Sequence, residues 1–420
     1  MIYDRKIAIK QISPYLDLLT DKIVRILNGI IGFLIMSRAL DQDQFGLFVV
    51  TTSWLGILAV IAGNGFANHT TRLASRHRHQ QDKILNTMIS TAQRASVVLV
   101  VVSIAIFQLY PVQQILFGTP IVLIFIPWLM LESRLYADQK TFYIRNITLI
   151  YIGISVALKL TFISLSFISN AALALIIGWD ISGYAIILRL FFGVNKNINY
   201  QPKTYLKSFK RPPIIKTGLL FLLTSLVGLI FVRSDLIMLG ALETKSQVAI
   251  YSVGSKITEL ATIFSTVVSL VIYPTIAKSS RGREKKLVVI KYLGFATLFS
   301  LALIPIIYFS ADSIIDVFFS EKYQDSSMIA QLLSITLPFI YVGTVFQKYL
   351  STEGLQNKIL SVTIIACSTN IILNLVLIPK FGASGAAYAT IFAQAIVTLG
   401  IFIYTEPRRK ICSLFSRQIY

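Results

Sequence analysis

Residues 45–67 read FGLFVVTTSWLGILAVIAGNGFA and contain no acidic or basic side chain. An α-helix rises about 1.5 Å per residue, so about 20 apolar residues cross the roughly 30 Å hydrocarbon core of a bilayer. This stretch is therefore long enough and apolar enough to form one membrane-spanning helix. It decides the fold, because runs of the same kind recur along the whole chain.

The composition agrees with a protein whose solvent is lipid. Of the 420 residues, 55% are hydrophobic and only 14% are charged, and the mean hydropathy is +0.72. We predict an all-α polytopic membrane protein with twelve transmembrane helices and no separate soluble domain. The predicted spans are residues 18–38, 45–67, 89–109, 115–133, 147–168, 171–188, 217–239, 248–277, 287–309, 328–347, 359–378 and 383–404.

The net charge of +20 is a topology signal. If the N-terminus is cytoplasmic, the cytoplasmic segments hold 28 Lys and Arg residues and the external loops hold three. This asymmetry follows the positive-inside rule. It favours twelve spans with both termini in the cytoplasm and gives no reason to expect a nucleic-acid partner. No cofactor is expected, because the chain has neither a nucleotide-binding motif nor a cluster of metal ligands.

The chain divides into two halves that repeat. A basic, proline-containing segment at 193–216 separates six predicted spans from six, so we predict a six-helix bundle at 1–192, a cytoplasmic linker at 193–216 and a second bundle with a tail at 217–420. The stretch LIMSRALD at 34–41 resembles LIMLGALE at 236–243, at the same place in each half. Two such bundles predict a transporter with a central cavity whose substrate site lies near the bilayer midplane.

Charged residues within the predicted spans mark the candidate site. Each costs about 2.5–3.5 kcal/mol at a helix centre unless it has a partner or faces water. Ten occur: Asp21, Lys22, Arg25, Glu132, Lys159, Asp180, Arg233, Asp235, Lys256 and Glu259.

Several of these charges can pair with one another. Asp21 and Arg25 are spaced i,i+4, and Lys256 and Glu259 are spaced i,i+3. Lys159 and Asp180 lie at similar depths on adjacent spans, while Asp235 can pair with Arg233 or Lys256. Two hypotheses stay open for the acids and for Lys159: they are structural pairs, or they carry a coupling ion.

Three of the cations within the spans suggest an anionic ligand. We predict that Arg25, Arg233 and Lys256 line the cavity and bind phosphate oxygens, a task that suits guanidinium groups. The alternative is a closed network in which neighbouring acids neutralise these bases.

Two stretches carry a resemblance to a known family. Residues 370–390, NIILNLVLIPKFGASGAAYAT, resemble the "N..LN..LIP.FG..GAA.AT" signature of bacterial polysaccharide-export flippases. Arg233-Ser-Asp235 followed by VAIYSVGSK at 248–256 is similar to their "R.D..MLG…..VGIYS.A.K" pattern, although this chain has Val-Ala-Ile-Tyr in place of Gly-Ile-Tyr. Physically, Pro379 and Gly382 predict a tight external turn, and Gly385 predicts close packing of the next helix.

The resemblance covers nearly the full chain and is to Wzx-type O-antigen flippases of the multidrug/oligosaccharidyl-lipid/polysaccharide (MOP) exporter superfamily. It implies alternating access in a bacterial inner membrane, with an undecaprenyl-pyrophosphate-linked oligosaccharide carried from the cytoplasmic to the periplasmic leaflet. It also implies an O-antigen polymerase and a chain-length regulator as partners, and it carries Arg233, Asp235 and Lys256 over as site residues.

Two other functions were weighed. An ion-coupled multidrug exporter of the same superfamily would place carboxylates and aromatic side chains, rather than bases, at the cavity. A membrane glycosyltransferase, polymerase or ligase would expose a large external loop, and the longest predicted one, residues 310–327, is too short. We therefore expect a transporter and not an enzyme.

Overall fold

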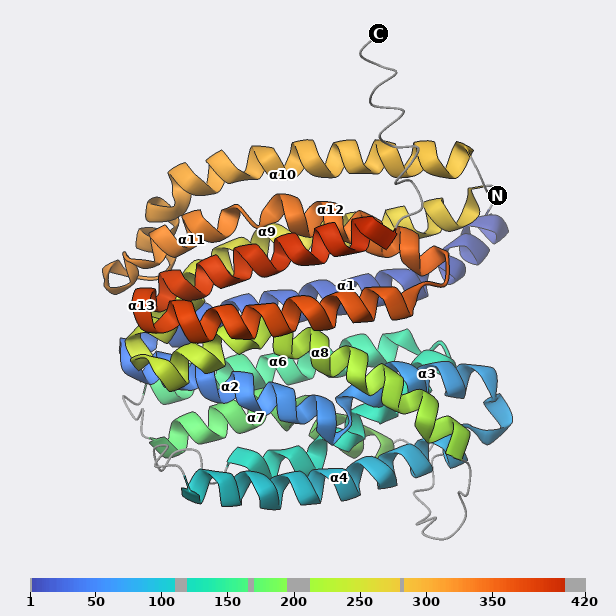
Figure 1. The fold of residues 1–420 in the computed structure, drawn as a ribbon. Coiled ribbons are helices and arrows are strands. Elements are labelled where there is room, and N and C mark those ends of the chain that lie inside the picture. The colour runs from blue at the N-terminus through green and yellow to red at the C-terminus, as the bar shows by residue number, and fades with distance from the viewer. Residues whose placement is uncertain (1, 110–118, 165–169, 195–211, 280–282, 405–420) are drawn as a thin grey trace. The chain divides into compact units, whose positions relative to one another are not determined.

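The computed structural model describes residues 2–109, 119–164, 170–194, 212–279 and 283–404. Nearly all of these residues lie in helices, and no strand occurs within these ranges (Figure 1). Helices satisfy every backbone hydrogen bond within one segment, which lipid requires because it offers no partners. The prediction of an all-α membrane protein is confirmed.

The first part of the chain forms long helices joined by short helical segments. The elements are α1 (Ile2–Ala39), α2 (Gln42–Ala62), η1 (Asn64–Phe66), α3 (Ala67–Arg76), η2 (Arg78–Gln80), α4 (Gln81–Leu109), η4 (Thr119–Leu131), α5 (Glu132–Ala137), α6 (Thr141–Ser164) and α7 (Asn170–Val194). η4 is a 3₁₀ helix with Pro127 inside it. Such a length is unusual, because 3₁₀ helices seldom exceed about four residues.

The second part of the chain is built in the same way. Its elements are α8 (Pro212–Leu242), α9 (Lys245–Lys278), α10 (Arg283–Phe318), η5 (Glu321–Tyr323), α11 (Ser326–Ser334), α12 (Leu337–Thr352) and α13 (Gln356–Tyr404). All twelve predicted spans overlap helices of the chain, and span 328–347 is divided between α11 and α12.

Length and apolar composition identify the helices that can cross a membrane. Within the described ranges eight helices qualify, and the pair α11–α12, bent by 44°, is a ninth candidate. The multi-pass character of the protein is therefore confirmed. The count of twelve spans and the cytoplasmic side of both termini stay predictions.

A sharp turn divides α13 into two helical arms. Gly382 has φ 56° and ψ −131°, a backbone conformation that favours glycine, and the amide of Ala383 donates to Gln247 Oε1 at 3.0 Å. Beyond the turn, a Cβ atom on Gly385 would lie 2.3 Å from the carbonyl oxygen of Leu377. The predicted turn at Gly382 and the predicted close packing at Gly385 are both confirmed.

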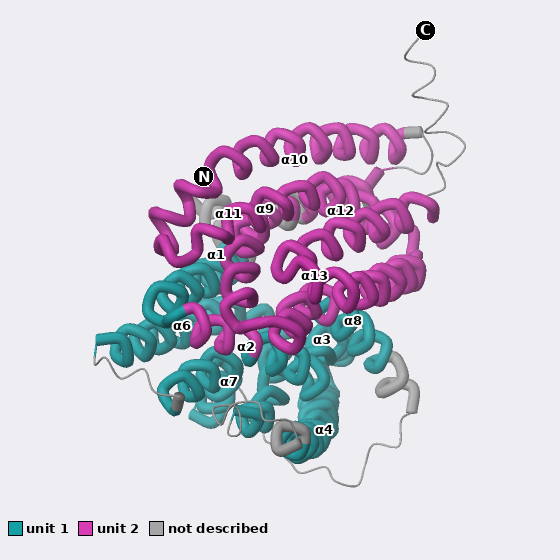
Figure 2. Tube along the Cα trace, turned by 60° about the vertical axis from the view of Figure 1, so that its left-hand side comes forward, with its two compact units in different colours: residues 1–41, 51–229 teal, residues 42–50, 230–420 magenta. Residues whose placement is uncertain are grey.

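Contacts divide the chain into two compact units (Figure 2). Unit 1 comprises residues 1–41 and 51–229, and unit 2 comprises residues 42–50 and 230–420. The start of α2 belongs to unit 2 because it packs on the start of α9: Ser246 Oγ donates to Gln42 Oε1 at 2.7 Å. The predicted linker at 193–216 falls mostly on residues 195–211, which lie outside the described ranges, so its boundaries stay a prediction.

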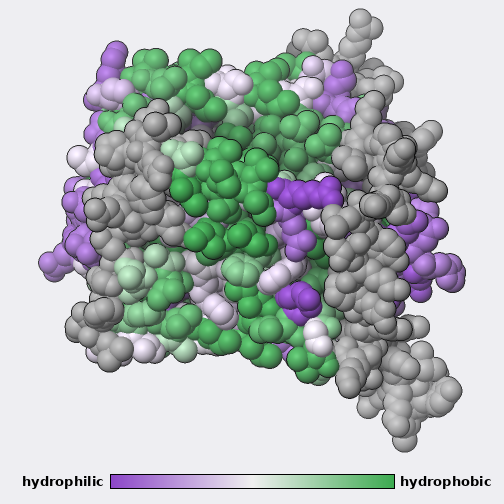
Figure 3. All heavy atoms as spheres, turned by 90° about the horizontal axis from the view of Figure 1, so that it is seen from below, coloured by the Kyte–Doolittle hydropathy of each residue, from purple (hydrophilic) through white to green (hydrophobic). Residues whose placement is uncertain are grey.

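Apolar side chains cover much of the outer surface. Figure 3 shows one face, where hydrophobic residues cover much of the middle with a few hydrophilic residues among them, and further hydrophilic residues lie along two opposite edges. On α4, Val98 and Val101 expose more than half of their surface, and on α10 Phe309 exposes 81%. Exposed side chains of this kind are costly in water and suit the hydrocarbon of a bilayer.

Candidate functional site

Two polar stripes face each other in unit 1, one on α1 and one on α6. Asp17 on α1 accepts from Arg145 Nη1 at 2.5 Å and from Thr141 Oγ1 at 3.2 Å. One turn further along α1, Asp21 Oδ1 accepts from Thr148 Oγ1 at 2.5 Å. The two acids are four residues apart, and their partners on α6 follow one another after four and three residues. Each stripe therefore lies along one side of its helix. The stripes place ionisable groups inside an apolar bundle.

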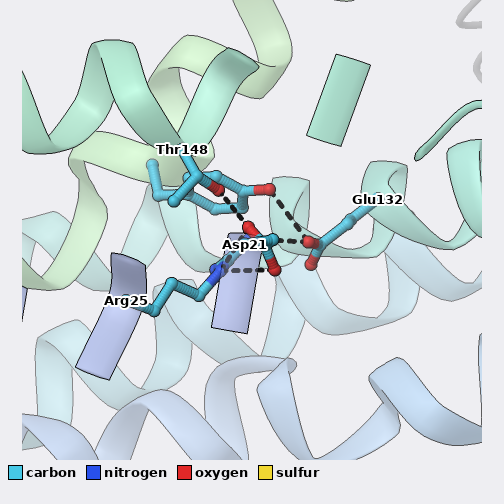
Figure 4. Close-up of polar contacts among 5 residues, drawn as sticks. Asp21, Arg25, Glu132 and Thr148 are labelled. Carbon is cyan, nitrogen blue, oxygen red and sulfur yellow. Dashed lines mark hydrogen bonds and ion pairs between the residues drawn. The ribbon is translucent and has the colours of Figure 1, made fainter. Parts of the chain in front are cut away.

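Arg25 lies at the centre of this polar region (Figure 4). Its Nε donates to both carboxylate oxygens of Asp21, at 2.9 and 3.1 Å, and its Nη2 donates to Glu132 Oε1 at 2.8 Å. Tyr184 on α7 donates to the same oxygen of Glu132 at 2.9 Å, and Arg25 Cζ lies 4.1 Å from the centre of the Tyr184 ring. Four elements, α1, α5, α6 and α7, therefore hold this cluster together.

Arg25 has one acidic partner more than the sequence predicted. The predicted Asp21–Arg25 pair is present, but Glu132 adds a second carboxylate. With both acids ionised, the three side chains carry a net charge of −1. The Arg25 side chain is 36% exposed, whereas that of Asp21 is 3% exposed and that of Glu132 18% exposed. Arg25 is thus the accessible member of a cluster that contains more acid than base.

Sequence reasoning identified Glu132 as a charge within a span but assigned it no partner. The partner is 107 residues away along the chain, and only tertiary packing brings the two together. Nothing in the sequence assigned Thr148 or Tyr184 to the site, because uncharged polar side chains are common in membrane helices.

Lys159 and Asp180 form a second buried pair in unit 1. Lys159 Nζ lies 2.8 Å from Asp180 Oδ1 and 2.9 Å from Ser155 Oγ, and Ser155 also donates to Asp180. The Lys159 side chain is 3% exposed, so its charge is neutralised within the protein. The predicted pairing is confirmed, and a role in ion coupling stays a prediction.

Asp235 in unit 2 is a buried acid held by uncharged groups. Its carboxylate accepts from Tyr251 at 2.7 Å, from Asn374 Nδ2 at 2.6 Å and from Thr390 at 2.5 Å, and the residue is only 4% exposed. The sequence left open whether Asp235 pairs with Arg233 or Lys256. Neither ion pair occurs in the described structure, where α9 and α13 supply neutral donors instead.

These partners come from the stretches that carried the family resemblance. Tyr251 belongs to 248–256, and Asn374 and Thr390 belong to 370–390. The sequence interpretation assigned the second stretch to a turn and to close packing and missed its polar side chains. The polar side chains within these two stretches are the signal that could have revealed the site.

The atoms around Asp235 can hold a proton or a small cation. An ionised carboxylate is costly when buried among neutral groups. A bound proton or a bound cation would neutralise the charge of Asp235. Asn370 Nδ2 and Asn374 Oδ1 are buried there without hydrogen-bond partners in the described structure. Because the oxygen and nitrogen of an amide are exchanged by rotation, Asn374 can turn its carbonyl oxygen toward Asp235 in place of its N–H donor, and such an oxygen is a ligand for hard cations.

The other predicted residues of unit 2 lie on α8 and α9. Lys256 Nζ contacts Glu259 Oε2 at 2.6 Å, which confirms the predicted i,i+3 pair, and the Glu259 side chain is 59% exposed. Arg233, two residues before Asp235 on α8, is partly exposed and makes no hydrogen bond or ion pair with any part of the chain that the structure describes. The three predicted phosphate ligands are thus divided, with Arg25 in unit 1 and Arg233 and Lys256 in unit 2.

A conventional metal centre is not seen in the described ranges. No group of three or more His, Cys, Asp or Glu side chains there is arranged to hold a metal ion. Of the three histidines, His69 is buried and its ring lies 5.3 Å from that of Phe221, while His77 and His79 are exposed.

Comparison with known proteins gives sequence relatives and structural neighbours. A family model described as "Polysaccharide biosynthesis protein" matches residues 35–328. The probable low-salt glycan biosynthesis flippase Agl15 of Haloferax volcanii is 22% identical over an alignment of 389 residues. The match covers 88% of this chain and 78% of the relative. The capsular polysaccharide biosynthesis protein CapF of Staphylococcus aureus is 23% identical over 62% of this chain and 68% of its own length.

Solved structures share the fold at low sequence identity. The lipid II flippase MurJ in an inward-closed conformation superposes with a TM-score of 0.76 at 18% identity, covering 93% of this chain and 87% of that one. An inward-facing multidrug resistance MATE family transporter of the MOP superfamily gives a TM-score of 0.75 at 14% identity, covering 96% and 99%.

Proposed function

Because this chain belongs to the polysaccharide biosynthesis protein family, we propose that it is a flippase that carries a lipid-linked oligosaccharide across a membrane by alternating access. The support comes from the family match, from relatives named as glycan biosynthesis proteins and from the fold shared with a lipid II flippase. These relatives are named as flippases and biosynthesis proteins, and the chain is a transporter rather than an enzyme.

Arg233 is the observation that carries the proposal of an anionic substrate. It lies within α8, in an apolar segment able to cross the membrane, and has no protein partner in the described ranges. A guanidinium group in that setting costs about 2.5–3.5 kcal/mol unless it faces water or binds an anion. A pyrophosphate group offers oxygens spaced for its paired N–H donors. Lys256 and Arg25, each already paired with acid, complete the proposed cationic set.

The finer identity of the substrate rests on the motif resemblance. We propose an undecaprenyl-pyrophosphate-linked O-antigen repeat unit, or a related polysaccharide unit, moved from the cytoplasmic to the periplasmic leaflet of a bacterial inner membrane. An O-antigen polymerase and a chain-length regulator are the proposed partners that receive and extend the product.

Asp235 is the proposed coupling residue. Its uncharged surroundings favour loading with a proton or a monovalent cation, and its hydrogen bonds join α8, α9 and α13. Loading or unloading the carboxylate would change all three connections at once, which links an ion gradient to helix packing. Asp21, Lys159, Asp180 and Glu259 stay secondary candidates, since each has an ion-pair partner.

The proposed function is tested by complementation of a flippase-null strain that has lost O-antigen export. Wild type is expected to restore export. Arg233→Ala and Lys256→Ala, expressed at matched membrane levels, should each reduce export at least tenfold, which corresponds to a loss of about 1.4 kcal/mol of binding energy. Arg233→Lys keeps the charge without the paired donors and should be intermediate. The matched control, Lys286→Ala near the start of α10, should behave as wild type.

Three other results would redirect the interpretation. Normal export by both alanine variants would refute the site while leaving the flippase function standing. Failure of wild type with several repeat-unit structures would refute the flippase function. Such a failure combined with drug resistance in cells expressing the chain would establish the ion-coupled multidrug exporter, for which the MATE-like fold and the buried Asp235 are the supporting observations.

A further inference from the structure

We propose that Glu132 occupies the anion site of Arg25 in the empty transporter, so that the phosphate group of the substrate must displace it. The proposal rests on the proposed flippase function and deepens it, because it names the group that decides when Arg25 accepts an anion. The ligand chemistry is a pyrophosphate, whose oxygens would take over the bonds that Glu132 Oε1 now accepts.

The charge balance of the cluster requires such a displacement. Arg25 is bonded to two carboxylates, so the site has no positive charge to offer while both are ionised. A pyrophosphate that approached without removing one acid would meet net negative charge at short range, where the repulsion is strong. One carboxylate must therefore move away or take up a proton before Arg25 can bind a phosphate oxygen.

The two carboxylates are not equivalent. Asp21 lies one turn from Arg25 on the same helix, is 3% exposed and also accepts from Thr148. Glu132 is 18% exposed and reaches Arg25 from a different element. Asp21 is thus fixed by its own helix, and Glu132 is the acid that can leave.

The position of Glu132 in the chain also suits withdrawal. It is the first residue of α5 and follows the 3₁₀ segment η4, which contains Pro127. A long 3₁₀ segment has poor hydrogen-bond geometry and often marks a hinge. A small change in η4 would carry Glu132 away from Arg25 without disturbing the α1–α6 contacts.

Tyr184 supplies a second hydrogen-bond donor at the position of Glu132 Oε1. Its hydroxyl donates to Glu132 Oε1, the atom that also accepts from Arg25. A phosphate oxygen placed at that position would receive both donors. The site therefore presents a preformed pair of donors, currently used by a carboxylate.

The test compares binding of two probes, inorganic pyrophosphate and farnesyl pyrophosphate, to the full chain in lipid nanodiscs. Glu132→Gln keeps an oxygen acceptor for Arg25 and Tyr184 but removes the charge. We expect it to bind both probes about tenfold more tightly than wild type at pH 7.5. The matched control is Asp138→Asn, which removes a carboxylate from Arg134 near the end of α5 and should leave affinity unchanged.

A pH series separates competition from a structural effect. The ionisable groups facing Glu132 are Arg25 and Asp21 on α1, Tyr184 on α7 and Tyr136 on its own helix, and Glu132→Gln retains all of them. The affinity advantage of the variant over wild type should narrow as the pH is lowered, because protonation neutralises Glu132 in wild type but has no such effect in the Glu132→Gln variant. A merely structural effect would give a constant ratio.

The outcomes distinguish this inference from the proposed function. If wild type binds the probes and restores export but Glu132→Gln binds no more tightly, the displacement model is refuted and the flippase function stands. If neither protein binds and wild type fails in complementation, the proposed function itself is refuted. Tyr184→Phe keeps the ring over Arg25 but removes the hydroxyl that now donates to Glu132 and would donate to the phosphate, so it provides a second check and should not tighten binding.

Discussion

Asp235, the proposed coupling residue, is held by neutral hydrogen-bond donors. Three neutral donors fix its carboxylate, and no Lys or Arg side chain pairs with it in the described structure. A neighbouring lysine would have neutralised it permanently. Neutral donors instead stabilise the charged form only partly, and for that reason we propose that a mobile ion binds and leaves at Asp235.

Replacement of Asp235 by asparagine tests this role. The amide keeps an oxygen acceptor but cannot exchange a proton or hold a cation by charge. We expect Asp235→Asn to reach the membrane at normal levels, to lose at least tenfold in transport rate and to become insensitive to an imposed proton or sodium gradient. Transport into proteoliposomes measures this, with the exposed Asp312→Asn as control. Unchanged gradient dependence would rule out Asp235 as the coupling residue.

The charged residues also show how far sequence reasoning reached at this scale. Pairs within one helix, such as Asp21–Arg25 and Lys256–Glu259, follow from spacing alone, and Lys159–Asp180 follows from the depths of two consecutive spans. The contact of Glu132 with Arg25 and the ring of donors around Asp235 join distant spans. Their geometry depends on helix packing, which a hydropathy pattern does not specify.

At the scale of elements, apolar runs predicted the positions of the helices but not their full extent or type. α1 begins at Ile2 and α10 continues to Phe318, beyond the predicted spans 18–38 and 287–309. Polar residues extend these helices past the apolar run, where the hydropathy signal ends. The 3₁₀ character of η4 was also missed, because an apolar run of this length predicts a helix but does not distinguish a 3₁₀ helix from an α-helix. The turn in α13 was predicted because proline and glycine act through local backbone geometry.

Close packing at that turn gives a direct test. Because a Cβ on Gly385 would lie 2.3 Å from a backbone oxygen, Gly385→Ala must push two helical arms apart. We expect a loss of about 2 kcal/mol of stability, measured as a lower thermal midpoint of the purified protein in detergent. Gly294→Ala in α10 is the matched control, because nothing lies within 4 Å of its added Cβ. Equal midpoints for the two variants would contradict the packing described here.

At the scale of the whole molecule, the distribution of Lys and Arg predicts the orientation in the membrane. With 28 of these residues in predicted cytoplasmic segments and three in external loops, the loop near η5 should be external and the loop between α12 and α13 cytoplasmic. The asymmetry of Lys and Arg over the whole chain, rather than within these two loops, decides the prediction.

Cysteine labelling of the full chain in intact cells checks this orientation. After replacement of Cys367 and Cys412, a membrane-impermeant maleimide should label Glu321→Cys but should label Asn357→Cys only once the cells are opened. Both positions are exposed in the structure. The reverse pattern would invert the topology, and labelling of both in intact cells would change the number of spans between them.

The two bonds of Arg25 also have a consequence for how the protein is made. Asp21 leaves the ribosome only four residues before Arg25, so α1 can enter the membrane with its charge already paired. Glu132 follows 107 residues later, after α2 and α4 have been synthesised. The Asp21–Arg25 pair can therefore form early, and the contact between Arg25 and Glu132 is formed late. A nascent chain stopped before residue 132 would carry an Arg25 that still lacks this second acid.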